Sequence, residues 1–113
     1  MTRHILEFRP VDKARFYEIK NGLKTIETRA ASANNNAIEA GDEIEFVCGE
    51  ERFLKKVIKK YRWPSIEAML AEMPLKNIMP GVNTVEQVHE RYASYPNYLE
   101  TIEKFGILGF ELA

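Results

Sequence analysis

A long strand with a change of face is the feature that most constrains the fold. The strand is predicted from Arg52 to about Tyr61, and its apolar residues fall on both parities: Phe53, Val57 and Tyr61 on one, and Leu54 and Ile58 on the other. Side chains alternate between the two faces of a strand, so a flat strand with one buried face would keep its apolar residues on one parity. A coiled strand, or one with a β-bulge, can switch parity. The pattern therefore favours a short, strongly bent sheet, which tends to close into a barrel.

Further local signals place four more strands and three helices along the chain. The predicted strands cover residues 5–8, 23–29, 43–48, 52–61 and 106–112, and the predicted helices begin near residues 11, 65 and 84. Two helix starts carry capping signals, because Ser65 is a favoured N-cap residue and Thr84 followed by Gln87 matches a capping box. Gly106 and Gly109 in the last strand indicate a bend or a close approach of backbones. We predict an α+β protein, a small bent or closed β-barrel of about five strands with about three flanking helices.

Size and composition exclude some classes of protein and disfavour others. The chain of 113 residues reads as a single domain over residues 1–113, large enough to fold without metal or disulfides. Its net charge of −1 is unlike that of proteins that bind nucleic acid through bulk charge. The single cysteine, Cys48, fits a reducing compartment, and no apolar run approaches the roughly 18 residues of a membrane helix. We therefore expect a cytoplasmic protein with no membrane association and no obligate protein partner.

The residues able to hold a metal do not form a recognisable set. His4 and His89 lie far apart in the sequence, and Cys48 shares its strand parity with apolar neighbours. Structural roles are the simplest interpretation for all three. Phosphate-binding glycine loops and the common nucleophile motifs are absent from the sequence. We predict no metal and no cofactor.

The segment from Gly22 to Arg29 carries the most information about function. On a strand, Thr25, Glu27 and Arg29 point to one face, and polar groups on an inner strand need partners because unpaired buried charge is costly. One interpretation is an exposed face with a simple pair between Glu27 and Arg29. The other is the polar wall of a cleft with Lys24 at its mouth. Lys24 has the opposite parity, but it follows the Gly22 turn directly, where its long side chain can reach round.

The spacing G-x-K-x-x-E-x-R, at Gly22, Lys24, Glu27 and Arg29, resembles the signature of the ASCH domain, a relative of the PUA-like β-barrels. The predicted helix before the glycine and the glycine-led apolar strand at the end of the chain add to the resemblance. It covers essentially all 113 residues. The resemblance implies a barrel with a cleft between it and the helices, suited to a nucleobase or RNA.

Some small bacterial members of this superfamily are amidohydrolases that remove the acyl group from N(4)-acetylcytidine. They use a lysine, a threonine three residues later and a glutamate from a later helix. Lys24 matches the lysine, whereas Glu27 stands at the position of the threonine. Glu86, in the predicted helix after Thr84, is the best match for the glutamate, and Glu90 one turn later is the alternative.

The resemblance therefore implies an amidohydrolase that acts on N(4)-acylated cytosine nucleosides, with a small nucleoside as its partner. Amide cleavage needs an activated nucleophile, stabilisation of the oxyanion and a proton for the leaving amine. We assign these roles to Glu27 as general base toward water, Lys24 at the oxyanion and Glu86 at the cytosine amine. Thr25 and Arg29 are assigned to substrate binding, with Thr25 as a reserve nucleophile.

The alternative function is a non-catalytic module that binds RNA or a modified nucleotide. The segment from Lys55 to Trp63 mixes basic and aromatic residues, as tracking of a phosphate backbone with base stacking requires. The simpler interpretation is a solvated strand, because glutamates on the neighbouring predicted strand offset much of this charge. In this interpretation, the Trp63 side chain caps the hydrophobic core.

The segment that follows Arg29 has the lowest complexity in the chain. Residues 30–37 are small or carry amides, so they have little to bury, and we predict a mobile loop. Because this loop starts at the edge of the proposed cleft, we expect residues 30–40 to act as a lid over a bound ligand.

Overall fold

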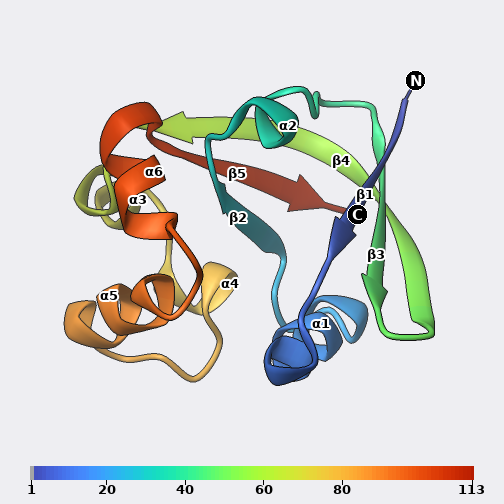
Figure 1. The fold of residues 1–113 in the computed structure, drawn as a ribbon, viewed down its shortest axis with the longest axis horizontal. Helices are drawn as coiled ribbons and strands as arrows, with labels where there is room; N and C mark the ends of the chain where they lie inside the picture. The colour runs from blue at the N-terminus through green and yellow to red at the C-terminus, as the bar shows by residue number, and fades with distance from the viewer. Residues whose placement is uncertain (1) are drawn as a thin grey trace.

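One five-stranded mixed sheet organises the computed structural model, which describes residues 2–113 (Figure 1). The strands are β1 (Arg3–Glu7), β2 (Ile26–Ala30), β3 (Glu43–Cys48), β4 (Glu51–Trp63) and β5 (Ile107–Leu112). Their order in the sheet is β1-β3-β4-β5-β2, with β1 parallel to β3 and every other pair antiparallel. The sheet curls into a half-barrel, which confirms the prediction of a bent α+β fold with about five strands.

The bend lies in β4, the strand whose apolar residues change parity. Its first half pairs with β3 and its second half with β5, and the register with β5 shifts between Val57 and Lys59. Val57 is fully buried, while Ile58 at the shift is exposed. A β-bulge of this kind turns the following side chains to the other face. Odd-numbered residues are nevertheless buried on both sides of the shift, Val57 before it and Trp63 after it, whereas Leu54 and Ile58 are both exposed. The predicted bulge is present, but the even-numbered apolar residues that indicated it do not face the core.

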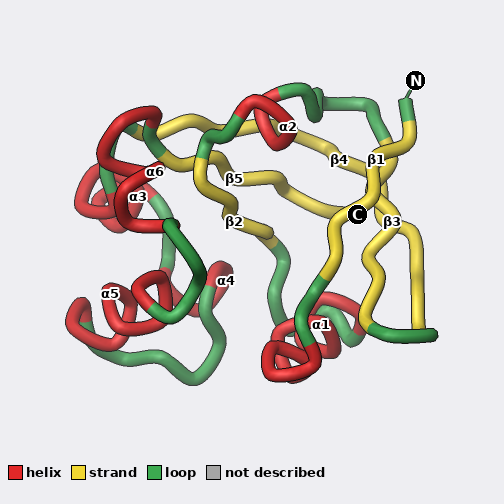
Figure 2. Tube along the Cα trace, viewed as in Figure 1, coloured by secondary structure: helices red, strands yellow, loops and turns green. Residues whose placement is uncertain are grey.

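Helices are more numerous than predicted. Within residues 2–113, a 3₁₀ turn (Pro10–Asp12) leads into the first of six α-helices, of which four have seven residues or more. The helices are α1 (Lys13–Lys20), α2 (Ala33–Asn36), α3 (Ile66–Glu72), α4 (Leu75–Ile78), α5 (Val85–Ala93) and α6 (Tyr98–Phe105). α3 to α6 gather at one side of the sheet, while α1 lies at the other side, below β1 and β3 (Figure 2). No helix among residues 2–113 has the length and apolar character to cross a bilayer.

Capping residues start two of these helices as predicted. The Ser65 hydroxyl accepts a hydrogen bond from the backbone N–H of Ala68 at 3.1 Å. The Thr84 hydroxyl accepts from the N–H of Gln87 at 3.2 Å, and the Gln87 side chain accepts from the N–H of Thr84 at 3.2 Å. Side-chain acceptors at these positions satisfy N–H groups that have no partner within the helix. Both predicted caps are confirmed.

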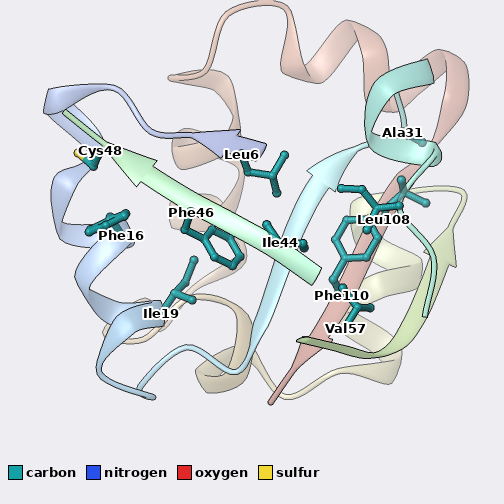
Figure 3. Packing of buried hydrophobic residues seen from close by; sticks show 11 residues of the cluster. Leu6, Phe16, Ile19, Ala31, Ile44, Phe46, Cys48, Val57, Leu108 and Phe110 are labelled. Atoms are coloured by element: carbon teal, nitrogen blue, oxygen red, sulfur yellow. The ribbon is translucent and has the colours of Figure 1, made fainter. Parts of the chain in front are cut away.

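Two hydrophobic clusters meet at β2. The first fills the concave side of the half-barrel, where Phe16 and Ile19 of α1 pack with Phe46 of β3 (Figure 3). The second lies among α3 to α6, and includes Trp63 and Ile26. Because β2 runs between the clusters, four of its five residues are buried. Any polar side chain on this strand must therefore find a partner inside the protein.

The segment after β2 differs from the predicted mobile loop. It contains α2, and Ala31 and Ile38 are 5% and 1% exposed within the first cluster. The amide of Asn35 donates to the carbonyl of Ala30 at 3.0 Å. The segment is therefore a short helix held by buried residues at both ends, Ala31 before it and Ile38 after it, although most of residues 33–37 are exposed.

Candidate functional site

A buried carboxylate with two cations is the centre of the site. Nζ of Lys24 lies 2.8 Å from Oε1 of Glu27, and Nε of Arg29 lies 2.9 Å from its Oε2. The backbone N–H of Thr28 also donates to Oε1 at 3.2 Å. Glu27 is 2% exposed and Lys24 is 7% exposed, so water screens this cluster poorly. We call these three side chains, Lys24, Glu27 and Arg29, the charged triad.

The local backbone explains how Lys24 joins the triad. Gly22 has a φ of +79°, which ends α1 in the left-handed region that glycine adopts without strain. The N–H groups of Leu23 and Lys24 then both donate to the carbonyl of Glu18, at 2.9 and 3.0 Å. Lys24 is thus held at the end of α1 and precedes β2, so the alternation of the strand does not apply to it. Its side chain reaches the face of Glu27.

The charge state of the triad follows from its burial and its pairing. Burial raises the pKa of Glu27, but the nearby charges of Lys24 and Arg29 outweigh it and hold the pKa below the usual range of a glutamate. Burial lowers the pKa of Arg29, and the Glu27 carboxylate more than offsets this effect. The carboxylate is therefore ionised at neutral pH, and the triad carries one net positive charge.

The triad forms part of the wall of a cavity of about 180 Å³. The cavity lies between β2, the start of α1 and the helices α5 and α6, so residues far apart in the sequence, from Glu7 to Tyr98, contribute to it. Its lining includes five cationic side chains and three carboxylates: Arg9, Arg15, Lys24, Arg29 and Arg91 against Glu7, Asp12 and Glu27. The excess of two positive charges favours an anionic or strongly polar ligand.

Three tyrosines, Tyr92, Tyr95 and Tyr98, form an aromatic wall of the same cavity. The ring centroids of Tyr92 and Tyr98 are 6.2 Å apart and stacked, and Tyr95 meets Tyr98 edge-on at 5.0 Å. Burial raises the pKa of Tyr95 to about 12 and also raises the pKa of Tyr92 and Tyr98. The phenols are therefore neutral. Tyr92 is 1% exposed and supports the wall from behind, so the half-buried rings of Tyr95 and Tyr98 are the ones suited to contact with a planar heterocycle.

Two residues predicted for the site lie elsewhere. Thr25 is exposed, does not line the cavity, and its N–H donates to the carbonyl of Asn77 at 3.1 Å. Glu86 is exposed in the first turn of α5 and does not line the cavity, and the same holds for Glu90 further along the helix. The structure brings Lys24, Glu27 and Arg29 together, but it does not bring Thr25, Glu86 or Glu90 to them.

The structure also places the proposed lid segment, the two histidines and the cysteine. None of residues 30–40 lines the cavity, so the segment proposed as a lid has no place in its wall. His4 lies 2.8 Å from Asp42 and His89 lies 3.0 Å from Glu67, while Cys48 is buried. Within residues 2–113, no group of histidine, cysteine and carboxylate side chains has the arrangement of a metal site.

The aromatic and arginine walls were missed by reasoning from sequence. The tyrosines repeat at every third position, Tyr92, Tyr95 and Tyr98, and this repeat is a signal that all three could share a surface. Arg15 and Arg91 come from α1 and α5, which only the tertiary fold brings to one cavity. No local pattern marks them.

Comparisons with known proteins show the fold without a function. No protein-family model matches the chain. No curated protein of similar sequence was found. The chain is similar to the crystal structure of a hypothetical protein, PH0355, with a TM-score of 0.79 and 26% identity over 99% of this chain and 97% of that one. It is also similar to the solution structure of protein PF0455 from Pyrococcus furiosus, with a TM-score of 0.66 and 26% identity over 98% of this chain and 94% of that one.

Proposed function

We propose that the protein is a single ASCH-type, PUA-like domain that hydrolyses the acyl group from N(4)-acylated cytosine nucleosides. The observation that carries the proposal is the 2.8 Å contact between the Lys24 ammonium and the Glu27 carboxylate in the wall of an aromatic cavity. A carboxylate and an ammonium group side by side offer a base and a site for a developing negative charge. The tyrosine wall offers a surface for the cytosine ring.

The reaction assigns two successive steps to Glu27. Its Oε2 accepts one hydrogen bond, from Arg29, so an acceptor site remains for the attacking water. Water adds to the acyl carbon while Glu27 takes its proton, and the Lys24 ammonium stabilises the oxyanion. The protonated carboxyl then gives this proton to the N4 nitrogen as the carbon–nitrogen bond breaks. The products are the free cytosine nucleoside and a carboxylic acid, and no second carboxylate is needed.

The low pKa of Glu27 sets a limit on this mechanism. A carboxylate held ionised by two cations is a weak base, so the water must be activated chiefly by position and by the charge of Lys24. Arg29 contributes by keeping the carboxylate in place, and its guanidinium also lies 4.9 Å from the ring of Phe8. Arg29 therefore holds Oε2 of Glu27, whereas Lys24 contacts Oε1.

The test is incubation with N(4)-acetylcytidine, with chromatography for free cytidine. We expect Lys24→Met and Glu27→Gln to lower turnover by about a hundredfold or more, the usual scale for a positioned base or oxyanion partner. Glu86→Gln is the matched control, because this glutamate is exposed and outside the cavity, and it should turn over normally.

Circular dichroism of each variant separates loss of activity from loss of folding. If Glu27→Gln does not fold, the Lys24 variant still decides, because it leaves the buried Glu27–Arg29 pair in place. Absence of cytidine release by the unaltered protein, or normal turnover by folded Lys24→Met, would contradict the proposal.

The excess of positive charge in the cavity favours a second candidate, binding of a modified nucleotide or RNA without catalysis. The basic strand β4 offers less to RNA than its sequence indicated. Nζ of Lys60 donates to the carbonyl of Asn36 at 2.8 Å and pairs with Glu39 at 3.2 Å. Trp63 is 3% exposed and therefore has no free face for a base.

Salt dependence distinguishes the two candidates. RNA held by Lys55, Lys56, Lys59 and Lys60 would release counterions, at about −0.7 in log affinity against log salt for each phosphate and about −3 for four. The Michaelis constant for a neutral nucleoside should barely change with salt. We expect the second result, in the cytoplasmic setting that the single free cysteine fits.

A further inference from the structure

Arg91 of α5 is a guanidinium in the cavity wall for which the protein provides no partner. Its Nη1 is buried and has no hydrogen-bond partner among residues 2–113. No ion pair within the same residues includes its side chain. Burial lowers the pKa of Arg91, and the charge of Arg15 lowers it further. A buried donor without an acceptor costs free energy, so its retention calls for an explanation.

A second arginine lies beside it and has donors to spare. Arg15 of α1 lines the same cavity, and Glu18 accepts from its Nε at 2.8 Å and its Nη2 at 3.2 Å. The Nη1 group of Arg15 has no hydrogen bond to residues 2–113. The positive charge of Arg15 lowers the pKa of Arg91, and both guanidinium groups line one cavity, so together they form a favourable site for an anion.

We propose that Arg91 and Arg15 form a phosphate subsite, so that the ligand of the cavity is a phosphorylated nucleotide rather than a free nucleoside. Guanidinium groups bind phosphate oxygens through charge-assisted hydrogen bonds, often two at a time. A phosphate would supply the missing acceptor for Nη1 of Arg91 and would neutralise the like charges. The inference rests on the proposed function for recognition of the cytosine base, and it adds a site for the phosphate of the same ligand.

The arrangement of the aromatic wall supports one ligand spanning both ends. Burial raises the pKa of Tyr95, the Glu27 carboxylate raises it further and the Arg91 charge lowers it. Tyr95 therefore lies within electrostatic reach of both the charged triad and the phosphate subsite. Arg9, anchored to Asp12 at 2.7 Å, places its guanidinium 5.5 Å from the ring centroid of Tyr95. A base on Tyr95 would then lie near both the triad and the arginines of the same cavity.

Titration calorimetry of the full chain tests the subsite with four probes: N(4)-acetylcytidine, its 5′-monophosphate, a trinucleotide with N(4)-acetylcytidine in the middle, and inorganic phosphate. Glu27→Gln or Lys24→Met is used where hydrolysis would interfere. We expect the phosphorylated probes to bind about tenfold or more tighter than the nucleoside. Preference for the monophosphate assigns a free nucleotide, and preference for the trinucleotide assigns the phosphodiester of RNA. Either preference supports the subsite.

Two substitutions at one position separate binding from structure. Arg91→Met should weaken binding of the phosphorylated probes by about tenfold to a hundredfold and leave the nucleoside unaffected. It should not lower the melting temperature, because it removes a buried charge without a partner and its repulsion with Arg15. Arg91→Lys keeps the charge and should retain part of the binding. Arg52→Ala, a surface arginine paired with Glu45, is the control that should change nothing.

The outcomes distinguish this inference from the proposed function. Equal binding of nucleoside and monophosphate, unchanged in Arg91→Met, would overturn the subsite while hydrolysis of N(4)-acetylcytidine still upheld the function. Tight binding of the monophosphate that depends on Arg91, without any hydrolysis, would support the subsite and contradict the function. A protein that binds none of the four probes would overturn both.

Discussion

The hydroxyl of Thr28 lies 2.6 Å from the phenolic oxygen of Tyr92, and this contact joins β2 to α5 across the cavity wall. Both side chains are buried, and Sδ of Met69 lies 3.9 Å from the same phenolic oxygen. The contact is the direct polar link between the strand that carries the charged triad and the helix that carries Arg91. The position of the aromatic wall relative to the triad therefore depends on it.

Removal of this hydrogen bond should weaken the whole fold. Tyr92→Phe leaves the Thr28 hydroxyl buried without its partner, and we expect the free energy of unfolding to fall by about 1–3 kcal/mol. Urea denaturation followed by circular dichroism measures this loss. Replacing both partners, in Tyr92→Phe with Thr28→Val, should cost less than the sum of the two single changes, because no polar group is then left unpaired. An unchanged free energy of unfolding for Tyr92→Phe would show that the contact does not stabilise the fold.

The charged triad should respond unequally to loss of its members. Glu27→Gln leaves two buried cations without their carboxylate, and breaking a buried ion pair in this way costs about 3–5 kcal/mol. Lys24→Met removes one cation but keeps the contact between Glu27 and Arg29 at 2.9 Å, so its effect should be smaller. Urea denaturation of both variants beside Glu100→Gln, an exposed glutamate of α6, compares them. Equal losses for Glu27→Gln and Lys24→Met would show that the carboxylate is not the centre of the triad.

Acid should destabilise the junction of β1 and β3 through Asp42. The His4 side chain and the backbone N–H groups of Glu39 and Thr2 lower the pKa of Asp42 from 3.8 to about 2. A carboxyl whose pKa is lower in the folded state stabilises the protein above its unfolded pKa, and this contribution is lost as pH falls. We therefore expect stability to decrease between about pH 4 and about pH 2, and Asp42→Asn to flatten this part of the profile. Thermal melting at a series of pH values provides the measurement, and parallel profiles for the two proteins would refute the assignment.

Two glycines allow the cost of a close contact to be separated from the cost of backbone conformation. Gly106 and Gly81 have φ of +90° and +83°, but a Cβ at Gly106 would lie 2.5 Å from the carbonyl oxygen of Trp63, whereas a Cβ at Gly81 would meet nothing within 4 Å. Gly81→Ala should therefore cost about 1 kcal/mol, from conformation alone. Gly106→Ala should cost about 1–3 kcal/mol more, because the backbone of β4 has to move.

The fluorescence of Trp63, the single tryptophan of the chain, reports both the unfolding of these variants and the local shift. A Cβ at Gly109 would lie 2.7 Å from the indole ring of this tryptophan, so the ring also packs closely against β5. Equal stabilities of Gly106→Ala and Gly81→Ala would mean that the approach of β4 to residue 106 is easily relaxed.

Much of the fold could be predicted because its signals are local. The caps at Ser65 and Thr84 and the bulge after Val57 depend on chemistry within a few residues. α6 was missed because its start has no such signal. Asn97 stands before it with a φ of +59° and no side-chain cap, directly after Pro96, and prolines commonly mark turns and loops.

The candidate site was predictable only where one short segment carries it. Lys24, Glu27 and Arg29 lie within six residues, so their proximity depends on one turn and one strand. The arginine and tyrosine walls depend on where α1 and α5 pack, which the pattern of either helix does not contain. Glu86 was selected for its place in a predicted helix, but that place is the exposed first turn.

The sheet order has a consequence for the time at which the site can exist in a newly made chain. Within residues 2–113, β2 pairs with β5 alone, and β5 follows the other four strands in the sequence. At usual rates of translation, β2 leaves the ribosome on the order of ten seconds before its partner. During that interval Glu27 and Arg29 belong to an unpaired strand, and no cavity can form around them. A product that ends before residue 107 lacks the pairing partner of β2, so we expect it not to bind the ligand.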